Sequence, residues 1–214
     1  MPKETFFNLP DEKRVTIQEA ALAEFAARGY AGASINRIVA AAGIAKGSFY
    51  QYFEDKADLF KQVLDYIAEL KMAYITPALI NPAGVDFFTL LEELYRMGLA
   101  FAKENSQAAR LGFEVNENKS APVFKELLRD SRKKADEFFG PLLDLAIERG
   151  EVNPTIDKQF VIFMIVQLQL ASLDYYLENS TRSDLEDDFM PTVRLMLDML
   201  RNGIGFHNKG ENNS

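Results

Sequence analysis

Apolar residues recur at helical spacing along most of the chain. In the first long run Ile17, Ala21 and Phe25 share one face; Pro10 begins this run and Gly29 ends it. Three further apolar runs follow at residues 34–42, 46–53 and 55–75. No stretch shows the period-two alternation that is typical of a half-buried β-strand. The pattern therefore predicts an all-α protein.

Capping residues and helix breakers mark the predicted helices of the remaining chain. Asp55, Asp86, Ser120 and Ser183 each have the residue type and position of a helix N-cap. We expect these later helices at residues 86–103, 106–116, 120–150, 157–177 and 183–203. Because proline has no backbone N–H, Pro141 should kink or split the helix at 120–150. We expect three regions: residues 1–54, a helical domain at 55–206 and a disordered polar tail at 207–214.

The net charge of −8 is distributed unevenly along the 214 residues. The first 56 residues carry seven basic and seven acidic side chains, so the whole acidic excess lies in the residues that follow. Residues 25–53 contain Arg28, Arg37 and Lys46 and no acid at all. An acidic protein is usually a poor candidate for binding nucleic acid. That argument does not apply to this acid-free segment.

The composition also limits which catalytic and metal sites the chain can form. The chain has no Cys and one His, and it has no zinc-protease, P-loop or nucleophile-elbow motif. We therefore expect no catalytic residues, no metal site and no cofactor. The absence of Cys suits a reducing compartment, and the first residues do not resemble a signal peptide. The longest apolar run, at 160–173, is too short to span a bilayer. We expect a cytoplasmic protein that has no membrane partner.

Two short predicted helices, at 34–42 and 46–53, are joined by a tight turn at Gly43. This arrangement indicates a helix-turn-helix, whose second helix fits the major groove of DNA. Gln51 has the amide that can bind adenine with two hydrogen bonds. Lys46 and the hydroxyl groups of Tyr50 and Tyr52 are suited to phosphate contacts.

In this region the chain resembles the TetR (tetracycline repressor) family of bacterial regulators. Four segments occur in the family's order and spacing: Phe25–Tyr30, Ser34–Ile44, Ala45–Phe53 and Asp55–Leu59. The resemblance implies a three-helix DNA-binding domain, joined by a helix to a C-terminal domain that binds a ligand and dimerises. It also implies a homodimer that binds a palindromic double-stranded operator, most often as a repressor.

The resemblance implies roles for particular residues as well. The expected DNA contacts are Ser34, Arg37, Lys46, Gly47, Ser48, Tyr50, Gln51, Tyr52 and Lys56. Ser34 and Arg37 would contact the backbone or the groove edge, and Lys56 would bind phosphate. Many family members have Ser or Thr where this chain has Ala45, so one helix cap and one possible phosphate contact are absent.

The C-terminal region is rich in aromatic residues, which could either line a ligand cavity or pack a core. Because family members typically bind an inducer here, we expect a small apolar or aromatic ligand. The candidate contacts are Phe88, Tyr95, Phe113, Glu114, Asn116, Phe138, Phe163 and Gln167.

The last two predicted helices carry apolar residues at helical spacing, which suits a four-helix dimer interface. The expected interface residues are Phe160, Met164, Leu168, Ala171, Tyr175, Phe189, Val193, Met196 and Leu200. Packing within one chain would produce the same spacing, so both interpretations stay open at this point.

Two other functions also fit the sequence. The first is a TetR-like activator or DNA-organising protein without an inducer. The second is a helical protein that binds or converts a small molecule and keeps a vestigial DNA unit.

Overall fold

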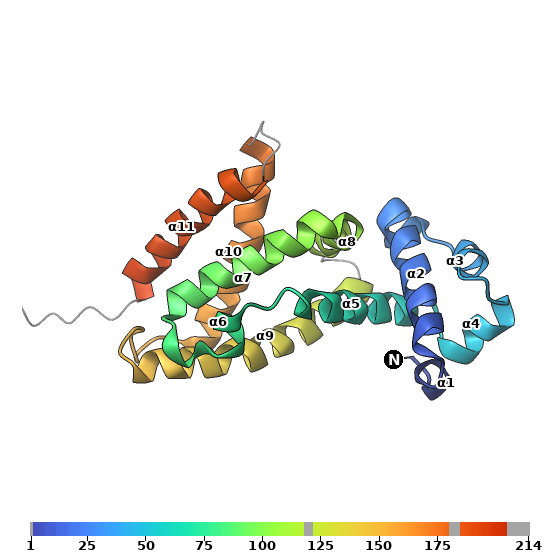
Figure 1. Cartoon of the computed structure of the whole chain (residues 1–214), viewed down its shortest axis with the longest axis horizontal. Helices are drawn as coiled ribbons and strands as arrows, with labels where there is room; N and C mark the ends of the chain where they lie inside the picture. Colours follow the sequence, from blue (N-terminus) through green and yellow to red (C-terminus); the bar gives the residue numbers. More distant parts are fainter. Residues whose placement is uncertain (1, 118–121, 180–184, 205–214) are drawn as a thin grey trace, which may run out of the picture. The chain divides into compact units, whose positions relative to one another are not determined.

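A computed structural model describes residues 2–117, 122–179 and 185–204 (Figure 1). These residues form helices and no β-strand, so the predicted all-α class is confirmed. The elements are α1 (Glu4–Phe7), α2 (Asp11–Gly32), α3 (Ile35–Ala41), α4 (Lys46–Tyr52), α5 (Lys56–Met72), α6 (Pro77–Ile80), the 3₁₀ turn η1 (Pro82–Gly84), α7 (Phe87–Glu104), α8 (Ser106–Glu117), α9 (Pro122–Glu148), α10 (Lys158–Asn179) and α11 (Leu185–Ile204). Among these helices, none is both long and apolar enough to cross a bilayer.

Most of the predicted helix ends agree with the structure, with three differences. The short helices α1 and α6 were not predicted. α9 continues through Pro141 as one helix, so the expected split is wrong. Because Pro141 is exposed, water can bind the carbonyl that the missing N–H leaves without a helical donor. The predicted caps at Ser120 and Ser183 lie outside the described residues.

By contacts, the chain divides into two units. The first unit comprises residues 1–74 and 101–128, and the second comprises residues 75–100 and 129–214. α5 and α8 therefore belong to the same unit as the predicted helix-turn-helix. The predicted domain boundary after residue 54 concerns function, and it stays a prediction.

An aromatic cluster forms the centre of the first unit. The ring of Phe60 on α5 lies 4.9 Å from the Phe25 ring and 5.1 Å from the Tyr30 ring, centroid to centroid. Phe124 extends the cluster, 5.7 Å from Phe60. Ile38 and Phe49, which are also fully buried, add α3 and α4 to this core. The buried apolar side chains therefore attach the helix-turn-helix to α2 and α5.

A kink inside α2 requires a glycine. Gly29 has φ 67° and ψ 167°, a conformation that residues with a side chain rarely adopt. The following N–H, from Tyr30, donates a 2.6 Å hydrogen bond to Oε1 of Glu114 on α8. A Cβ added to Gly29 would lie only 2.8 Å from the same oxygen. Glu114 therefore binds the turn that leads to α3.

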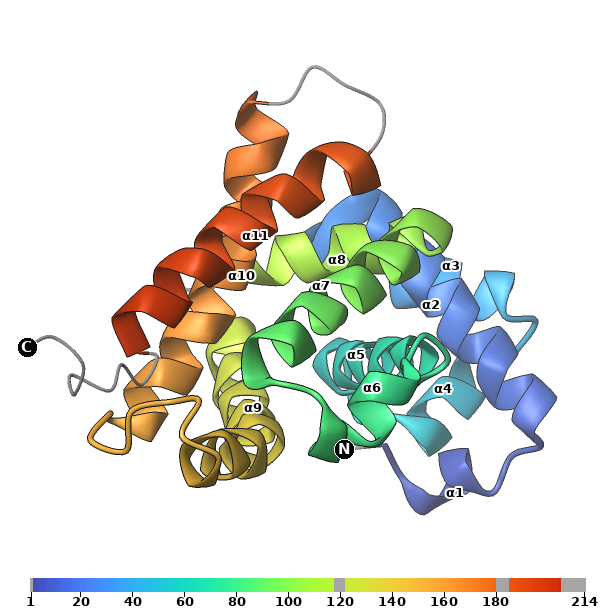
Figure 2. The same cartoon turned by 60° about the vertical axis from the view of Figure 1, so that its left-hand side comes forward.

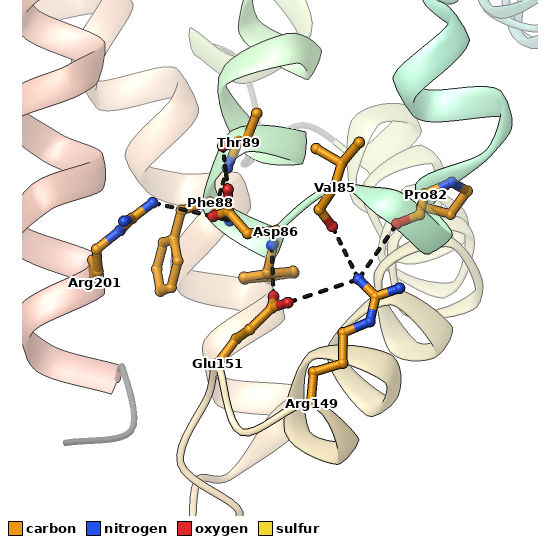
Figure 3. Close-up of polar contacts among 9 residues, drawn as sticks. Pro82, Val85, Asp86, Phe88, Thr89, Arg149, Glu151 and Arg201 are labelled. Carbon is orange, nitrogen blue, oxygen red and sulfur yellow. Dashed lines mark hydrogen bonds and ion pairs between the residues drawn. The ribbon is translucent and has the colours of Figure 1, made fainter. Parts of the chain in front are cut away.

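In the second unit, α7, α9, α10 and α11 surround a core that includes Phe87, Leu143 and Val193. α10 and α11 pack against each other (Figure 2). Polar contacts fix the start of α7 (Figure 3). Asp86 accepts hydrogen bonds from the N–H groups of Phe88 and Thr89, as its predicted cap role requires. Asp86 also pairs with Arg201 of α11 at 3.1 Å.

Candidate nucleic-acid interface

The turn between α3 and α4 has the geometry of a helix-turn-helix. Gly43 adopts φ 64°, which a glycine tolerates without strain. The N–H of Ile44 donates to the carbonyl of Val39 at 3.0 Å, which closes the turn. Ile38 and Phe49 are fully buried and hold the two helices together. The predicted helix-turn-helix is therefore confirmed.

One side of α4 is open to solvent. Lys46, Gly47, Tyr50 and Gln51 are exposed, and their positions fall on one side of a helix. We call these four residues the recognition face. Together they offer a cation, a phenol and an amide, and Gly47 adds no side chain. Ser48, at the edge of this face, is half-buried.

Tyr52 differs from the prediction. Only 8% of this residue is exposed, and its ring lies 6.5 Å from the ring of Phe6 on α1. The phosphate contact expected of the Tyr52 hydroxyl assumed an exposed side chain, because the sequence pattern did not predict α1. In the structure Tyr52 packs in the core of the first unit and lies outside the recognition face.

Neither short helix is capped by a side chain at its start. Ala45, at the N-cap of α4, has no side-chain oxygen, as its sequence already indicated. Ser34 lies at the N-cap of α3, but its hydroxyl makes no capping hydrogen bond. The N–H of Ser34 instead donates to Oε1 of Glu24 at 3.0 Å. A serine at this position predicts a side-chain cap, but α3 begins without one.

Two of the predicted DNA contacts, Arg37 and Lys56, also hold the α2–α3 turn. Nε of Arg37 donates to Oε1 of Glu24 at 2.7 Å, and Nη2 donates to the Gly32 carbonyl at 2.8 Å. The hydrogen bond from Arg37 holds the pKa of Glu24 below its usual value, although burial opposes this shift. Nζ of Lys56 donates to the carbonyls of Ala33 and Ala31, at 3.1 and 3.3 Å. For both cations, DNA contact stays a prediction.

The candidate ligand residues that the structure describes differ in burial and are divided between the two units. Phe88 and Tyr95 are buried in the core of the second unit, where the hydroxyl of Tyr95 lies 3.3 Å from Sδ of Met196. Phe138 and Phe163 are exposed, and Gln167 is half-buried. Glu114 belongs to the first unit and accepts the Tyr30 N–H beside the kink of α2. The side chains of Phe113 and Asn116 lie outside the described part of the chain.

The candidate dimer residues divide into buried, half-buried and exposed sets. Phe189, Val193 and Met196 are 2%, 0% and 9% exposed, so they pack in the core of their own unit. For these three, the alternative of core packing within one chain is correct. Leu200, Met164 and Leu168 are half-buried, while Phe160 and Ala171 are exposed. The side chain of Tyr175 lies outside the described residues.

The outward side of α11 carries two apolar residues that the sequence analysis did not select. Leu195 is 65% exposed and Met199 is 69% exposed, one helical turn apart. Phe160 on α10 is 59% exposed. We call Phe160, Leu195 and Met199 the outward apolar set. The sequence signal was available, because Leu195 and Met199 lie outside the apolar stripe of α11 and still share one face.

Comparison with known proteins gives a consistent result. The sequence pattern of "Bacterial regulatory proteins, tetR family" matches residues 17–63, which include α3 and α4. The transcriptional regulator RutR of Escherichia coli K12 is 28% identical over 94% of this chain and 86% of its own length. The repressor SCO4008 of Streptomyces coelicolor is 46% identical over a shorter region, 26% of this chain and 29% of its own length.

Solved structures share the fold over nearly the whole chain. A TetR-family regulator from Chloroflexus aurantiacus is 29% identical, with a TM-score of 0.68, over 97% of this chain and 100% of its own. FadR of Bacillus subtilis, solved with stearoyl-CoA, has a TM-score of 0.70 at 18% identity, over 89% of this chain and 98% of its own. The sequence pattern, the relatives and the solved structures all indicate the TetR family of bacterial regulatory proteins.

Proposed function

We propose that this chain is a transcriptional regulator that binds a palindromic DNA operator as a homodimer and releases it when a small apolar or aromatic ligand binds. The observation that carries the proposal is the recognition face of α4, which is exposed on a buried, well-packed helix-turn-helix. RutR, which is similar over most of the chain, is named a transcriptional regulator. SCO4008, which is similar over a shorter region, is named a transcriptional repressor. Repression is therefore the mode of action that we favour.

The charge distribution supports DNA contact at this face. Residues 25–53 contain three basic side chains and no acid, although the chain as a whole has a net charge of −8. A DNA surface carries a dense row of phosphates, so an acidic residue on the recognition face would be repelled. The acidic body would in turn limit nonspecific binding, and specificity would depend on the two recognition helices of a dimer.

A dimer is needed because one short helix reads only a few base pairs. The outward apolar set supplies surface for such a contact, since exposed apolar residues of this size are typical of interfaces. We propose that α10 and α11 pair with their copies in a second chain through this set. The two recognition helices would then enter adjacent major grooves about 34–36 Å apart.

The ligand part of the proposal rests on the second unit and on the fold. This unit contains many aromatic side chains, among them Phe88, Tyr95 and Phe139. FadR shares the fold and was solved with stearoyl-CoA, so the fold can hold a ligand that carries a long apolar chain. A ligand that favours one separation of the two recognition helices over another would shift the protein between DNA-binding and released states.

Selection from a random-sequence duplex library tests the proposal. We expect the purified chain to enrich duplexes with two inverted half-sites whose centres lie about one helical turn apart. A library without the chain, carried through the same rounds, is the control. Failure to enrich any sequence at low salt would contradict the proposal.

A further inference from the structure

The N-terminal segment of the chain donates hydrogen bonds to the backbone carbonyls at the end of α4. An α-helix leaves its last four carbonyls without a donor of its own, and α4 has only seven residues. Phe53 N–H donates to the carbonyl of Phe49 at 2.8 Å. The carbonyls of residues 50, 51 and 52 all receive their hydrogen bonds from Lys3 and Thr5.

Lys3 supplies two of these hydrogen bonds and Thr5 supplies the third. Nζ of Lys3 donates to the Tyr50 carbonyl at 2.8 Å, and its backbone N–H donates to the Tyr52 carbonyl at 2.8 Å. The hydroxyl of Thr5 donates to the carbonyl of Gln51. Two of the three carbonyls belong to residues of the recognition face, so these bonds act directly on the end of that face.

Packing reinforces the hydrogen bonds. α1 lies against α4 in both views (Figures 1 and 2). Phe6 of α1 is fully buried, and its ring lies 4.8 Å from the ring of Phe53, which directly follows α4. The same ring lies 6.5 Å from Tyr52. An apolar anchor and three polar contacts therefore join α1 to the same end of α4.

α1 is itself fixed to α2. Nη1 of Arg14 donates to the Phe7 carbonyl at 2.7 Å and to the Leu9 carbonyl at 3.3 Å. Nη2 of Arg14 pairs with Asp11 at 2.7 Å, which holds the guanidinium in place. α1 thus joins the first turn of α2 to the last turn of α4. The family pattern begins only at residue 17, so the residues of α1 and the first turn of α2 lie outside the matched region.

We propose that residues 3–7 form an N-terminal clasp that fixes the recognition helix, and that Lys3 and Thr5 are positioning residues for DNA recognition. The inference rests on the proposed function of α4. A seven-residue helix is too short to be stable by itself. Because the clasp orders α4 before DNA arrives, binding does not have to meet that ordering cost. We expect this ordering to raise the affinity for specific DNA sequences, because reading bases needs the side chains of the recognition face in fixed positions.

Paired substitutions separate the clasp from general effects of charge and stability. The test variant is Lys3→Met with Thr5→Val, which removes both side-chain donors and keeps their approximate size. The matched control is Lys13→Met with Thr16→Val on α2, where the Thr16 hydroxyl donates to the Glu12 carbonyl. Both double variants lose one cation and one hydroxyl hydrogen bond at exposed positions. Thr5→Ser keeps the hydroxyl and should behave as the unaltered chain.

The first readout is amide hydrogen exchange, which needs no DNA. We expect the amides of residues 49–53 to exchange roughly tenfold faster in the clasp variant. The same amides should keep their rates in the control variant and in Thr5→Ser. Unchanged exchange at the end of α4 in the clasp variant would overturn the proposal.

The second readout is the ratio of specific to nonspecific DNA affinity, with a duplex enriched by the unaltered chain and with sheared genomic DNA. We expect the ratio to fall roughly tenfold in the clasp variant and to stay constant in the control. An unchanged ratio would overturn the role in recognition. If the unaltered chain enriches no duplex, the proposed function fails, and hydrogen exchange still decides whether the clasp exists.

Discussion

Glutamates at positions 195 and 199 should leave the chain monomeric and lower its affinity for an enriched operator by on the order of 100-fold. Among the side chains of α11 that the structure describes, Leu195 and Met199 are the most exposed apolar ones, so the Leu195→Glu and Met199→Glu changes place two charges in the proposed interface without disturbing the core. Light scattering measures the mass, and fluorescence anisotropy measures the operator affinity. The large loss is expected because a monomer binds one half-site only.

Met72→Glu with Ile80→Glu is the matched control. These residues are 54% and 67% exposed on α5 and α6, so the control adds the same charge at comparable exposure. It should remain dimeric and keep its affinity for the operator. A dimer that persists in the Leu195→Glu, Met199→Glu variant would show that the outward side of α11 is not the interface.

Replacing Lys46 or Lys56 with Met should weaken binding to every DNA sequence and reduce the salt dependence, with a slope smaller by about one unit for each lysine. The two variants should differ in stability. Lys46 is exposed on the recognition face, while Nζ of Lys56 binds the carbonyls of Ala31 and Ala33. Lys56→Met should therefore also lower the free energy of unfolding by about 1 kcal/mol. Urea denaturation and titrations at several salt concentrations measure the two effects.

Separate results would contradict the predicted effect on salt dependence and the predicted effect on stability. An unchanged salt slope in Lys46→Met would exclude a phosphate contact from that side chain. Equal unfolding free energies for Lys56→Met and the unaltered chain would mean that its hydrogen bonds to the end of α2 do not stabilise the fold. A slope that falls for Lys46 alone would assign Lys56 a structural role only.

The helix-turn-helix was predictable because its signals are local. Gly29 and Gly43 were expected to break helices, and both adopt positive φ in the structure, Gly29 at a kink inside α2 and Gly43 in the turn after α3. Asp55 caps α5 through a 2.8 Å hydrogen bond from the N–H of Asp58, as its position indicates. The spacing of Ile38 and Phe49 identifies the faces that pack together. These features each depend on neighbours a few residues away.

The missed features depend on contacts between distant positions. α1 has four residues, too few to show a helical period, and its partners on α4 lie about 47 positions later. Tyr52 looked exposed because nothing in its own helix reveals Phe6. Glu114 looked like a ligand group, but it binds Tyr30, 84 positions earlier.

The candidate dimer residues show a different limit of prediction from sequence. Apolar residues at helical spacing identify the buried side of a helix, whether it is buried by its own chain or by a partner. Phe189, Val193 and Met196 therefore satisfied the pattern and proved to be core residues. The exposed fractions of Leu195 and Met199 show which side of α11 faces outward.

Cross-linking from the start of α4 tests the central claim most directly. The chain has no Cys, so Ala45→Cys provides a single attachment point for a photoactivatable DNA cross-linker beside the recognition face. Glu148→Cys, at the exposed end of α9, is the control. We predict cross-links from position 45 to bases within both half-sites of the enriched operator and none from position 148. Equal labelling from both positions, or none from position 45, would contradict the claim that α4 reads DNA.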